Sequence, residues 1–212
     1  MTPRQYRLGR REASVEQTRE RILQAARSLV SEAGFRAASL EQVAARADVA
    51  RATVYHHFTS KLGLLDALMY DAQERAGMNR LGRIEAEQPT GADALRVGIR
   101  EHCRCWAREQ TIFRNLIGLA AVDPEARKVI EHHDARWQAG IQQFVQRLAH
   151  EGSLRPAYSI EQATAVIHLL FSFETFDRLH ARSGLSVQAV ADTLTALATA
   201  VVTPDEHHTP SA

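Results

Sequence analysis

Residues 39–61 read SLEQVAARADVARATVYHHFTSK, and this stretch is the most informative about the fold. The pattern predicts two short helices, over residues 40–47 and 50–58, joined by a tight turn at Asp48-Val49. Small and apolar side chains form the inward set of this pair: Val43, Ala44, Ala47, Val49 and Val54. This is the helix-turn-helix pattern, in which the second helix enters the major groove of DNA.

The outward arc of the second helix carries hydrogen-bond donors. At about 100° per residue, Val54 and Phe58 share its inward face. Arg51 lies in the first turn, where it is predicted to grip guanine O6 and N7, and Ala52 is small enough to let the helix approach a thymine methyl. The prediction assigns phosphate contacts to Ser39, Thr53, Tyr55, His56, His57 and Lys61.

The rest of the chain favours an all-α fold, since Ala, Leu, Arg, Gln and Glu dominate it and strand-like alternation is absent. A Ser-x-x-Gln signature, typical of a capping box, occurs at Ser14, Ser39 and Ser159. The first helix is predicted over residues 15–33, with Gly34 as its stop. Its apolar stripe consists of Ile22, Ala26, Leu29 and Ala33.

The stretch resembles the DNA-binding domain of the tetracycline-repressor (TetR) family of transcriptional regulators over about residues 15–68. The matching residues are Gly34-Phe35, Ser39-Leu40, Val43-Ala44, Thr53-Val54-Tyr55-His56-His57-Phe58, Ser60-Lys61 and Leu64-Leu65. The resemblance implies a homodimer that binds palindromic operators, usually as a repressor, and is released by a small ligand in a C-terminal domain. It also implies phosphate contacts by residues matching Thr53, Tyr55, His57 and Lys61. Asp48 departs from the family, which often has Gly at the turn.

Composition excludes several other classes. The 212 residues carry a net charge of +1, and 45% apolar with 24% charged residues is ordinary for a globular protein. No uncharged run reaches the length of about 20 residues that a membrane span needs, and the basic start is not followed by the apolar stretch of a secretory signal. Cys103 and Cys105 point about 200° apart on a helix. We therefore expect a reduced, cytoplasmic protein.

Charge is unevenly distributed along the chain. Residues 1–61 contain 11 Lys and Arg against 6 Asp and Glu, a net charge of +5, whereas residues 62–212 have a net charge of −4. Basic charge is thus concentrated where phosphate contact is predicted. The expected organisation is a basic arm (1–13), which either contacts DNA or is a disordered tail, a helix-turn-helix domain (14–60), a connecting helix (61–88), a ligand-binding and dimerisation domain (89–203) and a flexible tail (204–212).

The C-terminal part is predicted to form helices over about residues 92–110, 112–121, 124–151, 160–182 and 187–202. The last of these has a heptad-like seam, and the helix before it offers Val166, Leu169 and Leu170. Together they predict a dimer interface, with core packing inside one subunit as the alternative. The interface residues are predicted to be Phe173, Phe176, Val187, Val190, Leu194, Leu197 and Val201.

Aromatic residues also gather in this part, which favours a pocket for a hydrophobic or aromatic effector, although aromatics at helical spacing are often core. The predicted ligand contacts are Trp106, Phe113, Trp137, Phe144, His168 and Phe171. Metal sensing is a less favoured alternative, because His102, Cys103 and Cys105 cannot converge from one regular helix. An enzyme is the rival class, but no nucleophile elbow, phosphate loop or paired-carboxylate motif is present. We expect no catalytic residues and no cofactor.

Overall fold

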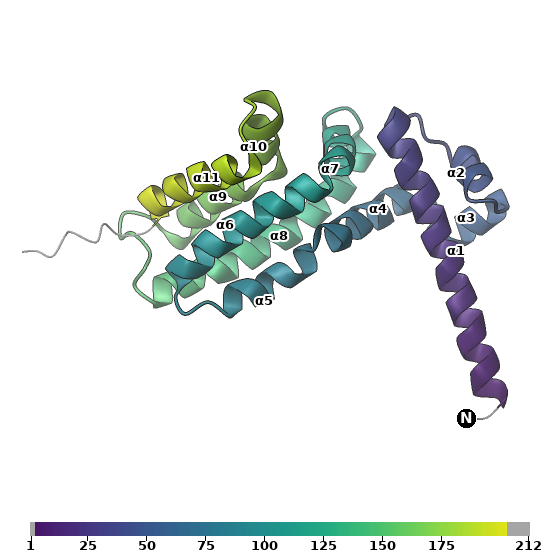
Figure 1. Ribbon diagram of the computed structural model, residues 1–212, viewed down its shortest axis with the longest axis horizontal. Coiled ribbons are helices and arrows are strands. Elements are labelled where there is room, and N and C mark those ends of the chain that lie inside the picture. Colours follow the sequence, from purple (N-terminus) through teal and green to yellow (C-terminus); the bar gives the residue numbers. More distant parts are fainter. Residues whose placement is uncertain (1–2, 203–212) are drawn as a thin grey trace, which may run out of the picture. The chain divides into compact units, whose positions relative to one another are not determined.

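Every regular element in the described part of the chain is a helix, as predicted (Figure 1). The computed structural model describes residues 3–202, and side chains over residues 13–200. The chain divides into two compact units. Unit 1 holds the described residues up to Ala72 and Thr111–Ile130; unit 2 holds Gln73–Gln110 and the described residues from Glu131 onward. Residues 111–130, expected in the C-terminal domain, therefore belong to the N-terminal unit.

The first helix, α1, spans Pro3–Ala33 and so begins well before the predicted start. Ser14 lies inside it, and the Ser14 carbonyl accepts a hydrogen bond from Thr18 Oγ1 at 2.9 Å. The predicted capping box at Ser14 is therefore wrong, and the backbone of the predicted arm continues the helix. Residues 4–13 are mostly good helix formers, and Pro3 suits the first helical position, so little in the sequence opposes this extension.

The core of unit 1 includes the inner face of α1. Ile22, Ala26 and Leu29 are buried as predicted, whereas Ala33 is exposed in the last turn of the helix. The chain leaves α1 at Gly34, whose φ of +79° lies in the region that favours glycine. Phe35 then enters the core, as its place after the helix stop requires.

The predicted helix-turn-helix is present as α2, Leu40–Arg46, packed on α3, Arg51–Phe58. The capping box of α2 is complete: Gln42 N donates to Ser39 Oγ at 3.1 Å, and Ser39 N donates to Gln42 Oε1 at 2.9 Å. Asp48 occupies the left-handed region with φ +53°, as expected for the residue that replaces the usual glycine.

The junction between α3 and α4 (Lys61–Ala76) depends on a glycine that sequence reasoning missed. Thr59 has a φ of +62°, and Ser60 Oγ accepts a hydrogen bond from Gly63 N at 3.0 Å. A Cβ atom at Gly63 would lie 2.0 Å from the backbone oxygen of Phe58. Only glycine therefore lets α4 begin so close to the end of α3.

The middle of the chain forms η1, Met78–Arg80; α5, Leu81–Ala86; α6, Gly91–Arg108; α7, Gln110–Ile117; η2, Gly118–Ala121; and α8, Pro124–His150. The predicted connecting helix over residues 61–88 is interrupted at Gly77, which has a φ of +88°. In unit 2, α5 lies along α6 (Figure 1). Asp123 Oδ1 caps α8, as predicted, by accepting from Glu125 N at 3.0 Å and Ala126 N at 3.1 Å.

The C-terminal helices are α9, Ile160–Phe171; α10, Phe173–Asp177; the π-helical turn η3, Arg178–Arg182; and α11, Val187–Val202. The single helix predicted over residues 160–182 is therefore wrong. Ser172 is extended, with ψ 151°, and its Oγ accepts from Thr175 N to begin a new helix. Helix α11 packs against α6 and α9. Among residues 3–202, no helix has the length and apolar character needed to cross a bilayer.

Candidate DNA-binding surface and effector pocket

The recognition helix α3 presents the predicted faces. Val54 is fully buried and Phe58 nearly so, which fixes the helix against the core of unit 1. The opposite face consists of exposed Arg51, Ala52, Tyr55 and His56, flanked by half-buried Thr53 and His57. A surface of donors is therefore available to a duplex, as the rotation of about 100° per residue predicts.

Arg51 is already engaged in the free chain. Its Nη1 lies 2.8 Å from Glu41 Oε1, and its Nη2 donates to Tyr55 Oη at 3.1 Å. The guanidinium carbon also lies 5.3 Å from the centre of the Tyr55 ring. The residue predicted to read bases is thus held between α2 and the next turn of α3, which sequence reasoning did not anticipate.

Ser39 and Lys61 are each half-buried and each make a structural contact. The Ser39 oxygen accepts from Gln42 N, and its hydroxyl also hydrogen-bonds the Glu41 carboxylate, a bond that a phosphate would have to replace. Lys61 Nζ donates to the Arg36 carbonyl at 3.0 Å and lies 5.1 Å from the centre of the Phe35 ring. Burial lowers the pKa of Lys61 from its ordinary value. Lys61 therefore also ties α4 to the segment after α1.

His56 and His57 meet edge to face, with ring centroids 5.7 Å apart. Burial, and next the charge of His56, lower the pKa of His57. A neutral imidazole still offers one N–H to a phosphate oxygen. His57 therefore suits hydrogen bonding better than ion pairing.

Two further ion pairs join helices of unit 1, and no local sequence pattern predicts either of them. Arg27 of α1 and Asp71 of α4 lie 2.8 Å apart and are largely buried. Arg46 of α2 and Glu32 of α1 lie 2.5 Å apart at the surface. Both pairs join residues from separate helices, so they depend on tertiary arrangement rather than on local spacing.

Three of the predicted ligand contacts meet in unit 2. The Trp106 and Trp137 rings stack, with centroids 4.8 Å apart and planes at 12°. Trp106 Nε1 donates to the Phe171 carbonyl at 2.8 Å. These residues come from α6, α8 and the end of α9, so the fold assembles an aromatic cluster from distant segments.

The other predicted ligand contacts lie elsewhere. Phe113 is fully buried in unit 1, because residues 111–117 of α7 belong to that unit, so its assignment to the cluster is corrected. His168 Nε2 lies 2.8 Å from Asp134 Oδ1, and Phe144 is half-buried. Neither of these two residues lines the pocket that the cluster borders.

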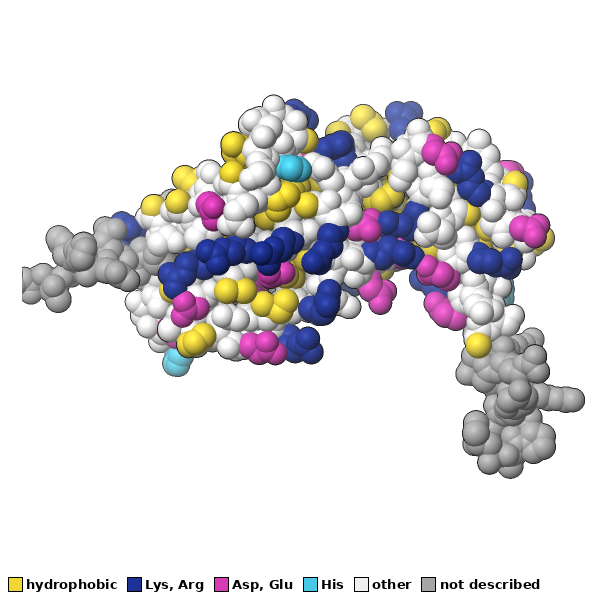
Figure 2. All heavy atoms as spheres, viewed as in Figure 1, with side chains coloured by type: hydrophobic (Ala, Val, Ile, Leu, Met, Phe, Trp, Pro, Cys, Tyr) yellow, Lys and Arg dark blue, Asp and Glu magenta, His cyan; other side chains and the backbone are white. Residues whose placement is uncertain are grey.

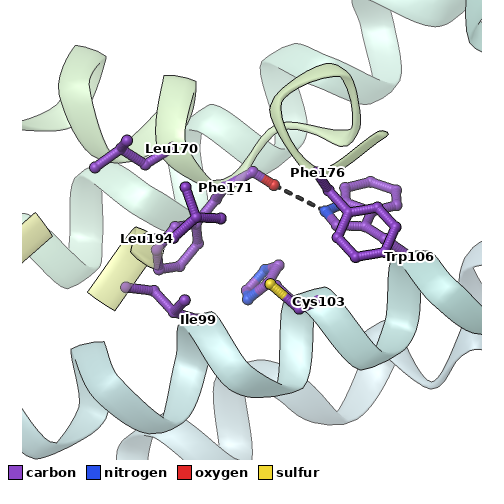
Figure 3. Close-up of a pocket in the computed structure, with 8 residues that line it drawn as sticks. Ile99, Cys103, Trp106, Leu170, Phe171, Phe176 and Leu194 are labelled. Carbon is purple, nitrogen blue, oxygen red and sulfur yellow. Dashed lines mark hydrogen bonds between the residues drawn. The ribbon is translucent and has the colours of Figure 1, made fainter. Parts of the chain in front are cut away.

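This pocket lies between α6 and the C-terminal helices (Figure 3). Its side chains are tightly packed and leave no room for a water molecule. The residues that line it are Ile99, His102, Cys103, Trp106, Leu170, Phe171, Phe176 and Leu194. Apolar and aromatic side chains with one histidine are the composition of a small-molecule pocket.

Buried polar groups adjoin the pocket. His102 Nδ1 lies 2.8 Å from the Gly98 carbonyl oxygen, and burial lowers the pKa of His102 to about 4. Glu85 Oε1 lies 3.9 Å from the same nitrogen, and burial raises the pKa of Glu85 to about 7. Burial likewise raises the pKa of the Cys103 thiol to about 12. At neutral pH the histidine and thiol at the pocket are therefore uncharged.

Most of the predicted interface residues are core residues instead. Phe173, Phe176, Val190 and Leu194 are buried within their own chain, where a second subunit cannot reach their side chains. They share the inward face of their helices because α10 and α11 pack on α6. Val187 is half-buried, Leu197 is 48% exposed, and the side chain of Val201 lies outside the described residues.

The surface of unit 2 is not uniformly acidic, despite the net charge of residues 62–212. Exposed arginines occur at every fourth residue of α6, which places them on one face: Arg96, Arg100, Arg104 and Arg108. Figure 2 shows Lys and Arg side chains in a row on the face of unit 2 that carries α6. Among the residues described, no three His, Cys, Asp or Glu side chains converge to hold a metal.

Comparison with known proteins agrees with this geometry. Residues 22–68 match the family model of bacterial regulatory proteins of the tetR family. The HTH-type transcriptional regulator UidR of Escherichia coli is 42% identical over 65 residues, which are 31% of this chain and 33% of UidR. The match therefore spans about a third of that relative.

Solved structures share the fold beyond that domain. NalD of Pseudomonas aeruginosa, the secondary repressor of the MexAB-OprM multidrug efflux pump, aligns with a TM-score of 0.72 and 24% identity, covering 92% of this chain and 99% of NalD. FadR of Bacillus subtilis, in complex with stearoyl-CoA, aligns with a TM-score of 0.72 and 19% identity, covering 85% and 97%. These relatives are named as regulators rather than enzymes. Residues 22–68 therefore form a helix-turn-helix domain of the tetR family of bacterial regulatory proteins.

Proposed function

We propose that the chain is a homodimeric transcriptional repressor that binds a palindromic operator through α3 and is released by a small-molecule effector. The observation that carries this proposal is the arrangement of α3: Val54 and Phe58 anchor it inward, and its donors face outward. The match of residues 22–68 to the tetR family supports the same function. The alternative of an enzyme has no comparable support.

On the DNA side, α3 enters the major groove with Arg51 and Ala52 toward the bases. Arg51 contacts guanine after exchanging its bonds to Glu41 and Tyr55 for the base. The remaining donors position the helix on phosphates without reading sequence: Ser39, Thr53, Tyr55, His56, His57 and Lys61. In a two-fold dimer, the half-sites then lie about 34–36 Å apart, one helical turn of DNA.

The dimer interface that we propose uses the outward faces of α9 and α11, which pack against each other within the chain. Leu169 is 63% exposed and Leu197 is 48% exposed, which leaves large apolar side chains uncovered. Exposed alanines at Ala165, Ala196 and Ala200 allow helices to approach closely. Two copies of this helix pair form a four-helix arrangement about a two-fold axis, and a palindromic operator requires that symmetry.

The effector binds unit 2, and we propose that it is hydrophobic or aromatic. The pocket composition supports this, and the FadR relative was solved in complex with stearoyl-CoA. A ligand weakens DNA binding only to the extent that it favours a state with lower affinity for the operator. We place the protein in the cytoplasm, where the bacterial chromosome lies.

Selection of bound fragments from a genomic DNA pool tests this function. The purified protein is expected to enrich a small set of fragments that share an inverted repeat, with light scattering of the complex showing at least two chains per site. Enrichment without a shared sequence would show that the chain binds DNA nonspecifically and would overturn the proposed operator. If the protein retains no DNA, the proposal as a whole is overturned.

A further inference from the structure

The pocket of unit 2 has a lining without charge, and this decides which ligands it accepts. None of its lining residues is an acid, lysine or arginine, and its histidine and cysteine are neutral at pH 7. A buried anion or cation without a partner is strongly disfavoured, so it would bind poorly here. The ligand class inferred for this pocket rests on the proposed function, in which the pocket receives the effector.

His102 offers the pocket a hydrogen-bond acceptor. Only 7% of the residue is exposed, and its Nδ1 lies 2.8 Å from the Gly98 carbonyl oxygen. A carbonyl oxygen only accepts, so Nδ1 carries the proton of the neutral ring and Nε2 is left as an acceptor. The hydrogen bond to Gly98 and the contact with Glu85 both involve Nδ1, so neither of them occupies Nε2. The neighbouring carboxylate of Glu85 lies on the Nδ1 side of the ring.

Trp137 does not line the pocket itself, but it packs against two residues that do, His102 and Trp106, and it carries a donor. Its ring stacks on Trp106, and its centroid lies 4.9 Å from that of His102. Its Nε1–H is buried and has no partner among the described residues, although a buried indole N–H usually finds one. An unpaired buried donor destabilises the pocket, and a ligand acceptor would relieve that cost on binding.

We infer that the effector is an uncharged, mostly apolar molecule bearing a hydroxyl group, which donates to His102 Nε2 and accepts from Trp137 Nε1–H. A hydroxyl is the small group that both donates and accepts. The apolar body of the ligand lies among Ile99, Phe171, Phe176 and Leu194. Because the pocket is closed around its own side chains, binding separates α6 from the C-terminal helices and favours a second state of unit 2.

Three para-substituted toluenes test the chemical class: p-cresol carries a hydroxyl, p-xylene a methyl group of similar size, and p-toluate a carboxylate. Both tryptophans of the chain lie in the stack, so their fluorescence, excited where the probes do not absorb, reports binding together with calorimetry. We expect p-cresol to bind roughly tenfold or more tightly than p-xylene, as one to two recovered hydrogen bonds imply, and p-toluate to bind weakest. Equal binding of p-cresol and p-xylene, tighter binding of p-toluate, or no binding of p-cresol would overturn the inference.

Matched variants test the two polar atoms. His102→Phe is expected to abolish the preference for p-cresol over p-xylene while retaining p-xylene binding, and Trp137→Phe to reduce that preference. His168→Phe makes the same chemical change outside the pocket and should leave the preference intact. An unchanged preference in both His102→Phe and Trp137→Phe would contradict the assignment. Retained p-xylene binding shows that each variant still folds. If His102→Phe does not fold, Trp137→Phe alone tests the assignment.

A separate measurement distinguishes failure of this inference from failure of the proposed function. Probe binding is measured without DNA, and release is then measured on a selected operator fragment. Binding of p-cresol without release of DNA would leave the site assigned and overturn its role as the effector site. Release of DNA by p-toluate would support an effector-responsive repressor and overturn the hydroxyl class.

Discussion

The guanidinium of Arg51 lies 2.8 Å from the carboxylate of Glu41, so the proposed base-reading residue is paired with the preceding helix of the same motif. Both side chains are more than half exposed, and such a pair contributes little to folding. Its consequence lies instead in DNA binding. A guanidinium that contacts guanine must leave this carboxylate, which would itself lie near the phosphates.

Glu41→Gln is therefore expected to tighten DNA binding roughly two- to fivefold, because it removes a competing partner of Arg51 and a negative charge from the DNA face. The measurement is fluorescence anisotropy with an operator fragment at two salt concentrations. Glu32→Gln is the matched control, since Glu32 pairs with Arg46 rather than with α3. Weaker operator binding by Glu41→Gln would show that Glu41 positions Arg51 for reading.

The phosphate assignments predict a different signature. Tyr55→Phe and Lys61→Met should weaken binding to every sequence alike, and Lys61→Met should lower the salt slope by about one. Methionine keeps the apolar stem of Lys61 beside Phe35 and loses the bond to the Arg36 carbonyl, so thermal melting must accompany the measurement. A Tyr55→Phe effect confined to one base pair would mean that Tyr55 acts through Arg51, its hydrogen-bond donor.

Leu197→Asp is expected to give monomers that no longer bind the operator, because it places a charge in the proposed interface. Multi-angle light scattering measures the change. Val122→Asp is the control: Val122 is 59% exposed and lies in unit 1. Leu194→Asp does not serve, since Leu194 is buried and a carboxylate there would disrupt the core itself. If Leu197→Asp remains a dimer, the interface lies elsewhere on the chain.

The buried pair Glu85 and His102 predicts opposing pH dependences of stability. The pKa of Glu85 is raised from 4.5 to about 7, so its contribution to the free energy of unfolding falls as the pH rises from 4.5 to 7. The pKa of His102 is lowered from 6.5 to about 4, so its contribution falls as the pH drops from 6.5 to 4. Each effect is on the order of 3 kcal/mol, and the two largely cancel between pH 4.5 and 6.5.

Single variants should separate the pH dependence of stability due to Glu85 from that due to His102. In Glu85→Gln, stability is expected to rise with pH from 4 to 6.5, and in His102→Phe it is expected to fall with pH from 4.5 to 7. Urea unfolding at several pH values measures both. Parallel pH profiles for the wild type and the two variants would show that neither group titrates differently on folding.

Features that depend on neighbouring residues alone were predicted from the sequence. Val54 and Phe58 face inward because helical rotation alone places them there, and the Ser39 and Gln42 capping box needs only a spacing of three residues. The tight turn at Asp48 is set by backbone conformation, and it took the expected left-handed form.

Features that depend on contacts between distant segments were not predicted from the sequence. The heptad-like seam of α11 marked Val190 and Leu194 as apolar, but burial in their own core or in a partner requires the same pattern. Phe113 follows α6 closely in sequence, yet its segment belongs to unit 1. Gly63 is required by the oxygen of Phe58 rather than by its own helix, and the bond of Arg51 to Glu41 joins two helices.

The proposed function depends above all on α3 reading DNA through Arg51. A binding comparison of the wild type and Arg51→Ala, on a selected operator and all its single-base variants, measures this directly. We predict that Arg51→Ala loses roughly tenfold or more of the discrimination at one symmetric pair of positions, with smaller changes elsewhere. Equal weakening at every position, or an unchanged profile, would contradict base reading by Arg51.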